Sequence, residues 1–164
     1  MRNLFLTAAF LILLLASCLK EKTFPVEPYI EFKSFTKITI PPDTITSALM
    51  LSFRFTDGDG DIGLYDHEKE PPYDYNLFID IYKRVNGQHE KIIFPDTTTT
   101  FNSRIPVIEE NENEKPIEGV LEYTFDYNLL RLFLLKDTIA FDVSIMDRAL
   151  NRSNVIRTPD IIIE

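Results

Sequence analysis

One short segment of the chain carries carboxylates at a spacing that suits metal binding. Asp57, Asp59 and Asp61 alternate with glycines in the run Asp57-Gly58-Asp59-Gly60-Asp61-Ile62-Gly63. Glycine permits the backbone dihedrals by which a chain curls around a point, and such a curl would bring the three carboxylates together. Calcium takes about six to eight hard oxygen ligands, and short loops supply them with alternating Asp residues. The segment therefore predicts a calcium-binding loop.

The register of a calcium loop adds two candidate ligands. With Asp57 at position 1, the carbonyl of Gly63 falls at position 7 and the carboxylate of Glu68 at position 12. Ile62 stands at position 6, where an EF-hand has glycine, and the segment follows a strand pattern rather than a helix. The hypothesis is therefore a calcium-like loop at one end of a β-structure, and not an EF-hand.

Alternating side chains predict the strands that must position this loop. Nonpolar residues take every second position in four runs, at 49–56, 77–82, 121–126 and 139–146. Successive side chains of a strand point to opposite faces, so each run predicts a strand with one buried and one wet face. Further strands are predicted at 29–35, 89–94, 103–108 and 154–163. About eight such strands favour an all-β antiparallel sandwich, with a barrel as the alternative.

Two connections have sequence signals of their own. Asn86-Gly87 lies between two predicted strands and is the pair that two-residue hairpin loops prefer. The segment 128–136 is nonpolar but does not alternate, and it predicts one short helical turn that links two sheets.

The first eighteen residues predict export and a lipid anchor. Arg2 precedes a nonpolar run over 4–15, which is shorter than the roughly 20 residues of a membrane span. Leu15-Ala16-Ser17-Cys18 resembles a bacterial lipobox, in which the cysteine thiol is acylated and becomes the new N-terminus. The alternative is an ordinary signal peptide that contains a cysteine. The prediction is a signal peptide at 1–17, lipidated Cys18 with a tether to residue 28, and one domain at 29–164.

Composition excludes several classes of function. The 164 residues include 17 Lys+Arg and 26 Asp+Glu, for a net charge of −9, and no basic cluster is present, which excludes nucleic-acid binding. The single cysteine excludes a disulfide framework and a thiolate zinc site. His67 and His89 lie in polar segments without a recognisable catalytic spacing, so the prediction is a protein that is not an enzyme.

Two segments, 53–63 and 147–154, resemble those of immunoglobulin-like β-sandwich lipoproteins of Bacteroidota-type bacteria, and the likeness extends loosely over 29–164. The resemblance implies an immunoglobulin-like sandwich displayed at the outer membrane or cell surface. Immunoglobulin domains carry a buried Trp and a cysteine pair, which this sequence lacks, so only the architecture carries over.

In that strand order the acidic turn, Asp57 to Gly63, shares an end with the last hairpin, which includes Asp147 and Asn151. Asp147 and Asn151 of the hairpin would then add oxygens to the calcium site, and Asp66 would cap it. The alternative needs no metal: Arg148 or Arg152 of the same hairpin would offset the mutual repulsion of the three aspartates.

Three tyrosines, Tyr65, Tyr73 and Tyr75, cluster just after the acidic turn. They would either stack on a sugar or a protein partner or seal the end of the sandwich over its core. The sequence as a whole predicts a membrane-anchored lipoprotein that acts as a non-enzymatic binding or structural module, with or without calcium. The alternatives are a glycan-binding accessory lipoprotein and a hydrolase with an unfamiliar carboxylate site.

Overall fold

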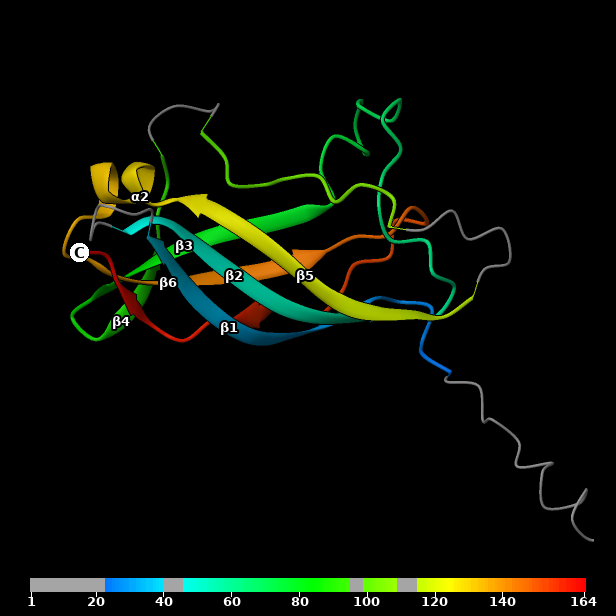
Figure 1. The fold of residues 1–164 in the computed structure, drawn as a ribbon, viewed down its shortest axis with the longest axis horizontal. Helices are drawn as coiled ribbons and strands as arrows, with labels where there is room; N and C mark the ends of the chain where they lie inside the picture. The colour runs from blue at the N-terminus through cyan, green and yellow to red at the C-terminus, as the bar shows by residue number, and fades with distance from the viewer. Residues whose placement is uncertain (1–22, 40–45, 95–98, 109–114) are drawn as a thin grey trace, which may run out of the picture.

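The structure, a computed structural model, describes residues 23–39, 46–94, 99–108 and 115–164 (Figure 1). The predicted signal peptide and Cys18 lie outside the described residues. The elements follow in the order β1 (Tyr29–Thr39), β2 (Thr46–Asp57), β3 (Leu77–Val85), β4 (Gln88–Lys91), β5 (Ile117–Asp126), α2 (Tyr127–Leu134), β6 (Thr138–Ile145), β7 (Ile156–Arg157) and β8 (Ile161–Ile162). The prediction of an all-β fold is confirmed.

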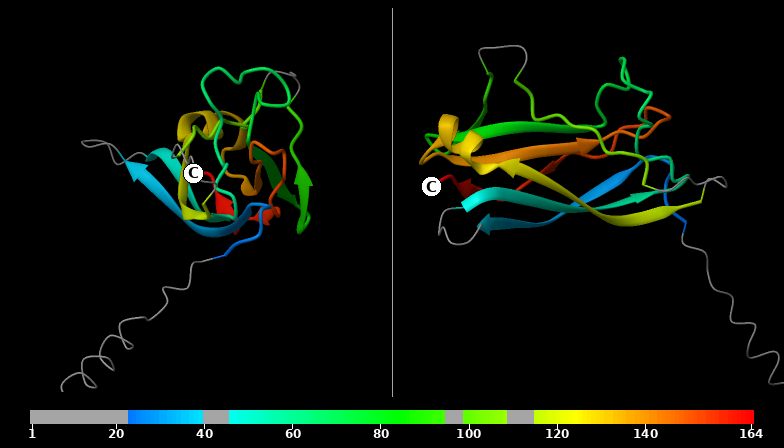
Figure 2. Two further views of the ribbon diagram at one scale, coloured as in Figure 1. Left: turned by 90° about the vertical axis from the view of Figure 1, so that its right-hand side faces the viewer. Right: turned by 45° about the horizontal axis from the view of Figure 1, so that its top comes forward.

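Two antiparallel sheets pack against each other as a sandwich (Figure 2). One sheet has the order β1-β2-β5, and the other has the order β4-β3-β6-β7, with β8 also paired to β6. Along β2 the register with β5 runs without a break from Ala48↔Asp126 to Asp57↔Ile117. The acidic turn therefore begins where the central strand of the first sheet ends.

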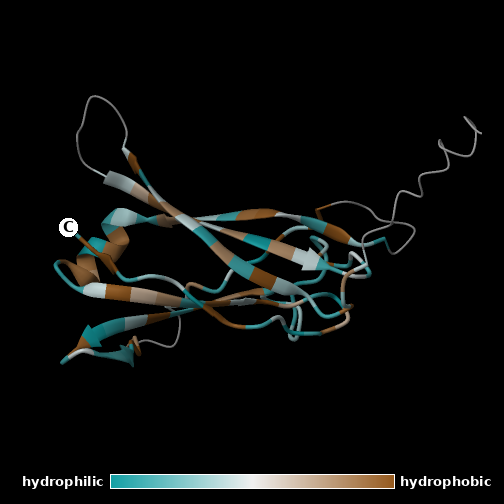
Figure 3. Ribbon diagram, turned by 90° about the horizontal axis from the view of Figure 1, so that it is seen from below, coloured by the Kyte–Doolittle hydropathy of each residue, from teal (hydrophilic) through white to brown (hydrophobic). Residues whose placement is uncertain are grey.

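Hydrophobic and hydrophilic residues follow one another along the strands (Figure 3), and the buried nonpolar side chains of the strands form the core. On β2, Leu49, Leu51 and Phe53 are fully buried. Phe125 of β5 and Phe141 of β6 stack across the two sheets with their ring centroids 4.5 Å apart. Burial of each such side chain contributes about 1.5–3 kcal/mol to folding, so this interior holds the end loops in place.

The predicted hairpin is confirmed between β3 and β4. Val85 pairs with Gln88, and the two loop residues between them have positive φ, 49° at Asn86 and 83° at Gly87. These dihedrals are those of a type I′ turn, whose twist matches that of the flanking strands.

The nonpolar segment after β5 forms the short helix α2, which links the two sheets as predicted. Its buried residues are Tyr127, Leu130 and Leu134, which lie on one face at helical spacing. The side chain of Asp126 caps the helix by accepting hydrogen bonds from the backbone N–H groups of Asn128 and Leu129.

Replacing Asp126 by alanine is expected to lower the free energy of unfolding by about 1 kcal/mol, because two N–H groups of the first turn lose their acceptor. Urea unfolding followed by circular dichroism measures the change. Asp126→Asn is the matched control because its side-chain oxygen can still accept, and an equal loss in this variant would contradict the capping role.

Two strand predictions need correction. The segment 103–108 is not a strand, because it makes only the isolated bridges Leu77↔Ser103 and Leu64↔Pro106. The segment 154–163 is divided into β7 and β8 at Thr158, whose side-chain oxygen accepts from the N–H of Phe141. The sandwich is confirmed, and the immunoglobulin-like strand order stays a prediction.

Candidate metal centre

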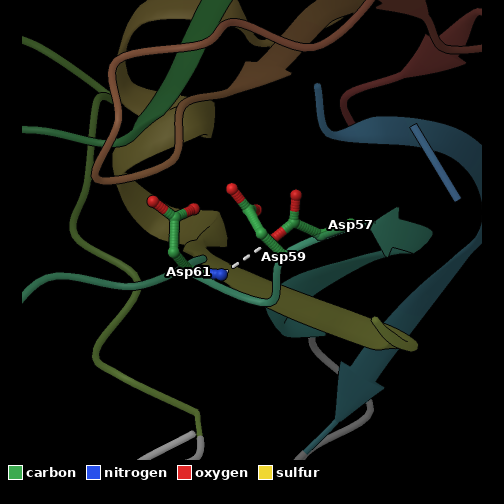
Figure 4. A group of neighbouring side chains, drawn as sticks. All are labelled: Asp57, Asp59 and Asp61. Atoms are coloured by element: carbon green, nitrogen blue, oxygen red, sulfur yellow. Dashed lines mark hydrogen bonds between the residues drawn. The ribbon is translucent and has the colours of Figure 1, made fainter. Parts of the chain in front are cut away.

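The three aspartates of the acidic turn lie together at the end of β2 (Figure 4). Asp57 is the last residue of the strand and is fully buried, whereas Asp59 and Asp61 are partly buried. Gly60, with a φ of 72°, turns the chain between them. One carboxylate oxygen of each aspartate lies within 4.8 Å of those of the other two. The cluster can therefore hold a metal ion.

Each of these aspartates has a buried oxygen without a partner. The Oδ1 atoms of Asp57, Asp59 and Asp61 are shielded from solvent and accept no hydrogen bond from any described residue. The second oxygen of Asp57 accepts from the N–H of Asp61 at 2.9 Å, and that of Asp61 accepts from the N–H of Ala149 at 2.9 Å. A buried acceptor without a donor costs about 1–3 kcal/mol, and more when it is charged. Three such oxygens side by side are the arrangement that a cation would stabilise.

Burial and mutual repulsion change the acid strength of these groups. Burial, and next the charges of Asp59 and Asp61, raise the pKa of Asp57 to about 7. The pKa of Asp61 is raised by burial and then by the charge of Asp147. Burial likewise raises the pKa of Asp147. The raised values mean that the metal-free site resists full ionisation.

The last hairpin lies beside the acidic turn, as expected if the two share one end of the sandwich. Ile62 forms a β-bridge with Asp147, which is fully buried. Both carboxylate oxygens of Asp147 already accept from Asn151, Oδ1 from the backbone N–H at 2.7 Å and Oδ2 from the side-chain amide at 2.9 Å. Asp147 therefore contributes negative charge next to the triad of Asp57, Asp59 and Asp61, while Asn151 donates hydrogen bonds to Asp147.

Neither arginine of this hairpin forms an ion pair with the triad. Arg148 donates to the carbonyl of Gly63 at 3.1 Å, and its charge lowers the pKa of Asp61 only as the weakest of several influences. Arg152 donates to Ser144 and lies over the ring of Phe78. The ion pairs of the described parts of the chain include none between Arg148 or Arg152 and these carboxylates. The described side chains therefore do not supply the arginine clamp of the metal-free interpretation.

The remaining residues of the predicted loop register have other contacts. The carbonyl of Gly63 accepts a hydrogen bond from Arg148. Glu68 closes a turn of its own, because its Oε2 accepts from the N–H of Tyr65 at 2.7 Å. Asp66, the predicted cap, is exposed on that turn. The structure thus brings together the first five positions of the register and does not bring Glu68 to them.

The three tyrosines do not form one exposed platform. Tyr65 is 38% exposed, and its ring stacks on His67 and lies 5.0 Å from the guanidinium of Arg148. Tyr73 and Tyr75 are partly buried, and the hydroxyl of Tyr73 donates to the carbonyl of Arg148. A sugar-stacking surface would therefore have to be built on Tyr65 alone.

One contact at this site could not be predicted from local sequence patterns. A Cβ atom on Gly58 would lie 2.4 Å from the carbonyl oxygen of Pro25 and 2.5 Å from that of Phe24, so only glycine fits there. The N-terminal segment thus crosses directly over the acidic turn, at the right-hand end of the sandwich in Figure 1. No periodicity or motif could have linked residues so far apart in the chain.

The hollow beside the edge of β3 has a volume of about 540 Å³. The hydrolase alternative requires a deep pocket with two facing carboxylates or a histidine. Among the described residues that line this hollow, the single carboxylate is Asp80, which accepts from Lys91 at 2.7 Å, and no histidine is present. The hollow therefore lacks the groups that the alternative requires.

Comparisons with known proteins give no relative. A scan against protein-family models finds no match, and neither curated proteins nor solved structures show significant similarity to this chain. Function must therefore be argued from the site itself.

Proposed function

We propose that this chain is an exported lipoprotein, held on a membrane through lipidated Cys18, whose sandwich is a non-enzymatic binding or structural module with a calcium site at its acidic turn. The observation that carries the calcium proposal is the set of three buried, unpartnered carboxylate oxygens on Asp57, Asp59 and Asp61. The observation behind the anchor is the sequence Leu15-Ala16-Ser17-Cys18.

The donor set favours calcium over other common cations. All three candidate ligands are hard carboxylate oxygens, whereas zinc and copper sites are built with His nitrogen or Cys sulfur. Magnesium requires a near-ideal octahedron and holds its waters tightly, while calcium accepts irregular sets of about six to eight oxygens. A turn that supplies three carboxylates leaves positions for water, which is typical of weak sites with a Kd of roughly 0.1–1 mM. Such a site would fill outside the cytoplasm, where calcium is abundant.

Calorimetric titration with calcium, run beside thermal unfolding, tests the metal site. We expect binding at sub-millimolar to millimolar calcium and a rise in Tm of about 5–10 °C near saturation, because a ligand at a hundred times its Kd adds about 2.7 kcal/mol. Magnesium is the control and should give a smaller response. Absence of both heat and thermal shift at millimolar calcium would refute the calcium site.

The lipid anchor is tested in cells. No helix in the described part of the chain is long and nonpolar enough to cross a bilayer. Cys18→Ser should move the protein from the membrane fraction to the soluble fraction and abolish labelling with a fatty-acid probe. Ser17→Ala, which keeps a small residue before the cysteine, is the matched control and should remain anchored. Membrane retention of the Cys18→Ser protein would contradict the anchor and leave the calcium test unaffected.

A further inference from the structure

The acidic turn lies at the end of the sandwich where the tether enters. Phe24 and Pro25 contact Gly58, and the C-terminus and α2 lie at the opposite end (Figure 1). If Cys18 carries the lipid, five residue steps separate it from Thr23, the first described residue. An extended chain covers at most about 3.6 Å per residue, so the entry point lies within roughly 20 Å of the anchored cysteine. The acidic end is therefore the end held at the membrane surface.

A calcium ion in this site would keep positions for outside ligands. The triad offers three unpartnered oxygens, fewer than the roughly six to eight that calcium takes. Asp57 is fully buried, but Asp59 and Asp61 are partly exposed, so solvent reaches the edge of the turn although the three Oδ1 atoms themselves are shielded. The phosphate oxygens of a lipid headgroup are hard ligands of the kind that calcium prefers.

Three exposed nonpolar side chains lie on segments that each contact the acidic turn. Val26 is 50% exposed and follows Pro25, which lies against Gly58. Tyr65 is 38% exposed beside Arg148, which bonds to the turn. Leu150 is 44% exposed in the loop whose backbone donates to Asp61. Tyrosine and small groups of nonpolar side chains favour the headgroup region of a bilayer.

We infer that the calcium-loaded acidic turn docks on anionic lipid headgroups of the membrane that carries the anchor, with Val26, Tyr65 and Leu150 entering the interface. The inference rests on the proposed calcium site and lipid anchor. Without calcium, the carboxylates of this end and the net charge of −9 repel an anionic surface. With calcium bound, the three aspartates would hold an ion that headgroup phosphate oxygens can also ligate, and the acidic end of the sandwich would be held against the membrane.

Vesicle sedimentation tests the docking without the covalent lipid. The chain from residue 18 with Cys18→Ser keeps the whole core, whose buried nonpolar residues lie between Ile30 and Ile163. It is mixed with vesicles of phosphatidylcholine alone or with phosphatidylglycerol added, in millimolar calcium, in magnesium or in EGTA. We expect calcium to raise the partition coefficient onto the anionic vesicles at least about tenfold, with little effect on the neutral ones.

A pair of identical substitutions separates docking from metal binding. Leu150 has a φ of 69°, which asparagine tolerates better than leucine, so Leu150→Asn keeps the loop and removes the nonpolar side chain. We expect it to bind calcium normally and to lose most of the vesicle binding. Leu132→Asn is the control, because Leu132 is 74% exposed on α2 at the other end, and it should bind vesicles as the parent does.

The outcomes distinguish this inference from the proposed function. Calcium binding in the calorimeter without calcium-dependent sedimentation would overturn the docking and leave the metal site intact. Absence of calcium binding would overturn the proposed function and the docking with it. Equal sedimentation in EGTA, or onto neutral vesicles, would overturn the calcium bridge to lipid phosphate.

Discussion

Asp57→Asn is expected to stabilise the metal-free protein at pH 7.5 and to remove its response to calcium. The carboxylate is fully buried, one of its oxygens has no donor, and its pKa is raised to about 7 by burial and by the neighbouring aspartates. Its ionisation at pH 7.5 therefore opposes folding. Asparagine removes the charge and keeps an oxygen that can accept from the N–H of Asp61. We expect a gain of about 1–3 kcal/mol in the free energy of unfolding without calcium.

The same substitution removes one of the three oxygens that converge on the proposed ion. We expect the affinity for calcium to fall at least about a hundredfold, equivalent to about 2.7 kcal/mol of binding free energy. Urea unfolding with EDTA and with calcium gives both results from one protein preparation. The variant should be more stable than the parent in EDTA, and calcium should stabilise the parent while adding little to the stability of the variant.

Asp66→Asn is the matched control for charge. Asp66 is exposed on the neighbouring turn, so its replacement should change stability by less than about 0.5 kcal/mol and leave the calcium response intact. If Asp57→Asn were instead destabilising in EDTA, the Asp57 carboxylate would be a structural acceptor that the fold needs, and the argument for a cation would fail.

The long strands could be predicted because nonpolar residues at every second position of a strand indicate which of its faces is buried. In 49–56 and 139–146 every second residue is a large nonpolar one, and these side chains are buried in the structure. The hairpin at Asn86-Gly87 is equally local, since its positive dihedrals select the residue types. The segment 103–108 has suitable residues but forms only isolated bridges, and no local pattern shows which segments lack a neighbouring strand.

The candidate site likewise contains residues whose positions could be predicted from the sequence and one, Glu68, whose position could not. The cluster of Asp57, Asp59 and Asp61 is predictable because these residues are close in sequence and stay close in space. Glu68 would join them only if the chain continued to curl after the fifth position of the loop. In the structure, Ile62 and Leu64 are buried, with 1% and 2% exposure, and their burial holds the chain against the end of the sandwich. Glu68 then begins a separate turn.

Contacts that depend on the tertiary fold could not be read from local patterns. The approach of Phe24 and Pro25 to Gly58 joins the segment before β1 to the turn after β2, and it gives the glycine a steric role. That contact also places the acidic turn at the end of the sandwich where the proposed tether enters, and the inference about lipid headgroups depends on it.

The dependence of stability on pH should change sign when calcium is added. In the metal-free protein the pKa of Asp57 is about 7 when folded and near 3.8 when unfolded, so between these values the folded state binds more protons. Stability must therefore fall as pH rises through this range, by about 2–3 kcal/mol between pH 5 and pH 8 from this group alone. The raised pKa values of Asp61 and Asp147 act in the same direction.

Calcium should reverse this trend because it binds only the ionised carboxylates and lowers their pKa in the folded state. Stability in saturating calcium should therefore stay level or increase from pH 5 to pH 8. Thermal unfolding across this range in EDTA and in calcium measures both slopes, and Asp57→Asn should flatten the EDTA curve. The metal-free interpretation, in which arginines offset the aspartates, predicts the opposite change of stability with pH in EDTA. Arginines paired with the aspartates would lower the carboxyl pKa values, so the protein in EDTA would lose stability toward acid, and that slope would overturn the cation site.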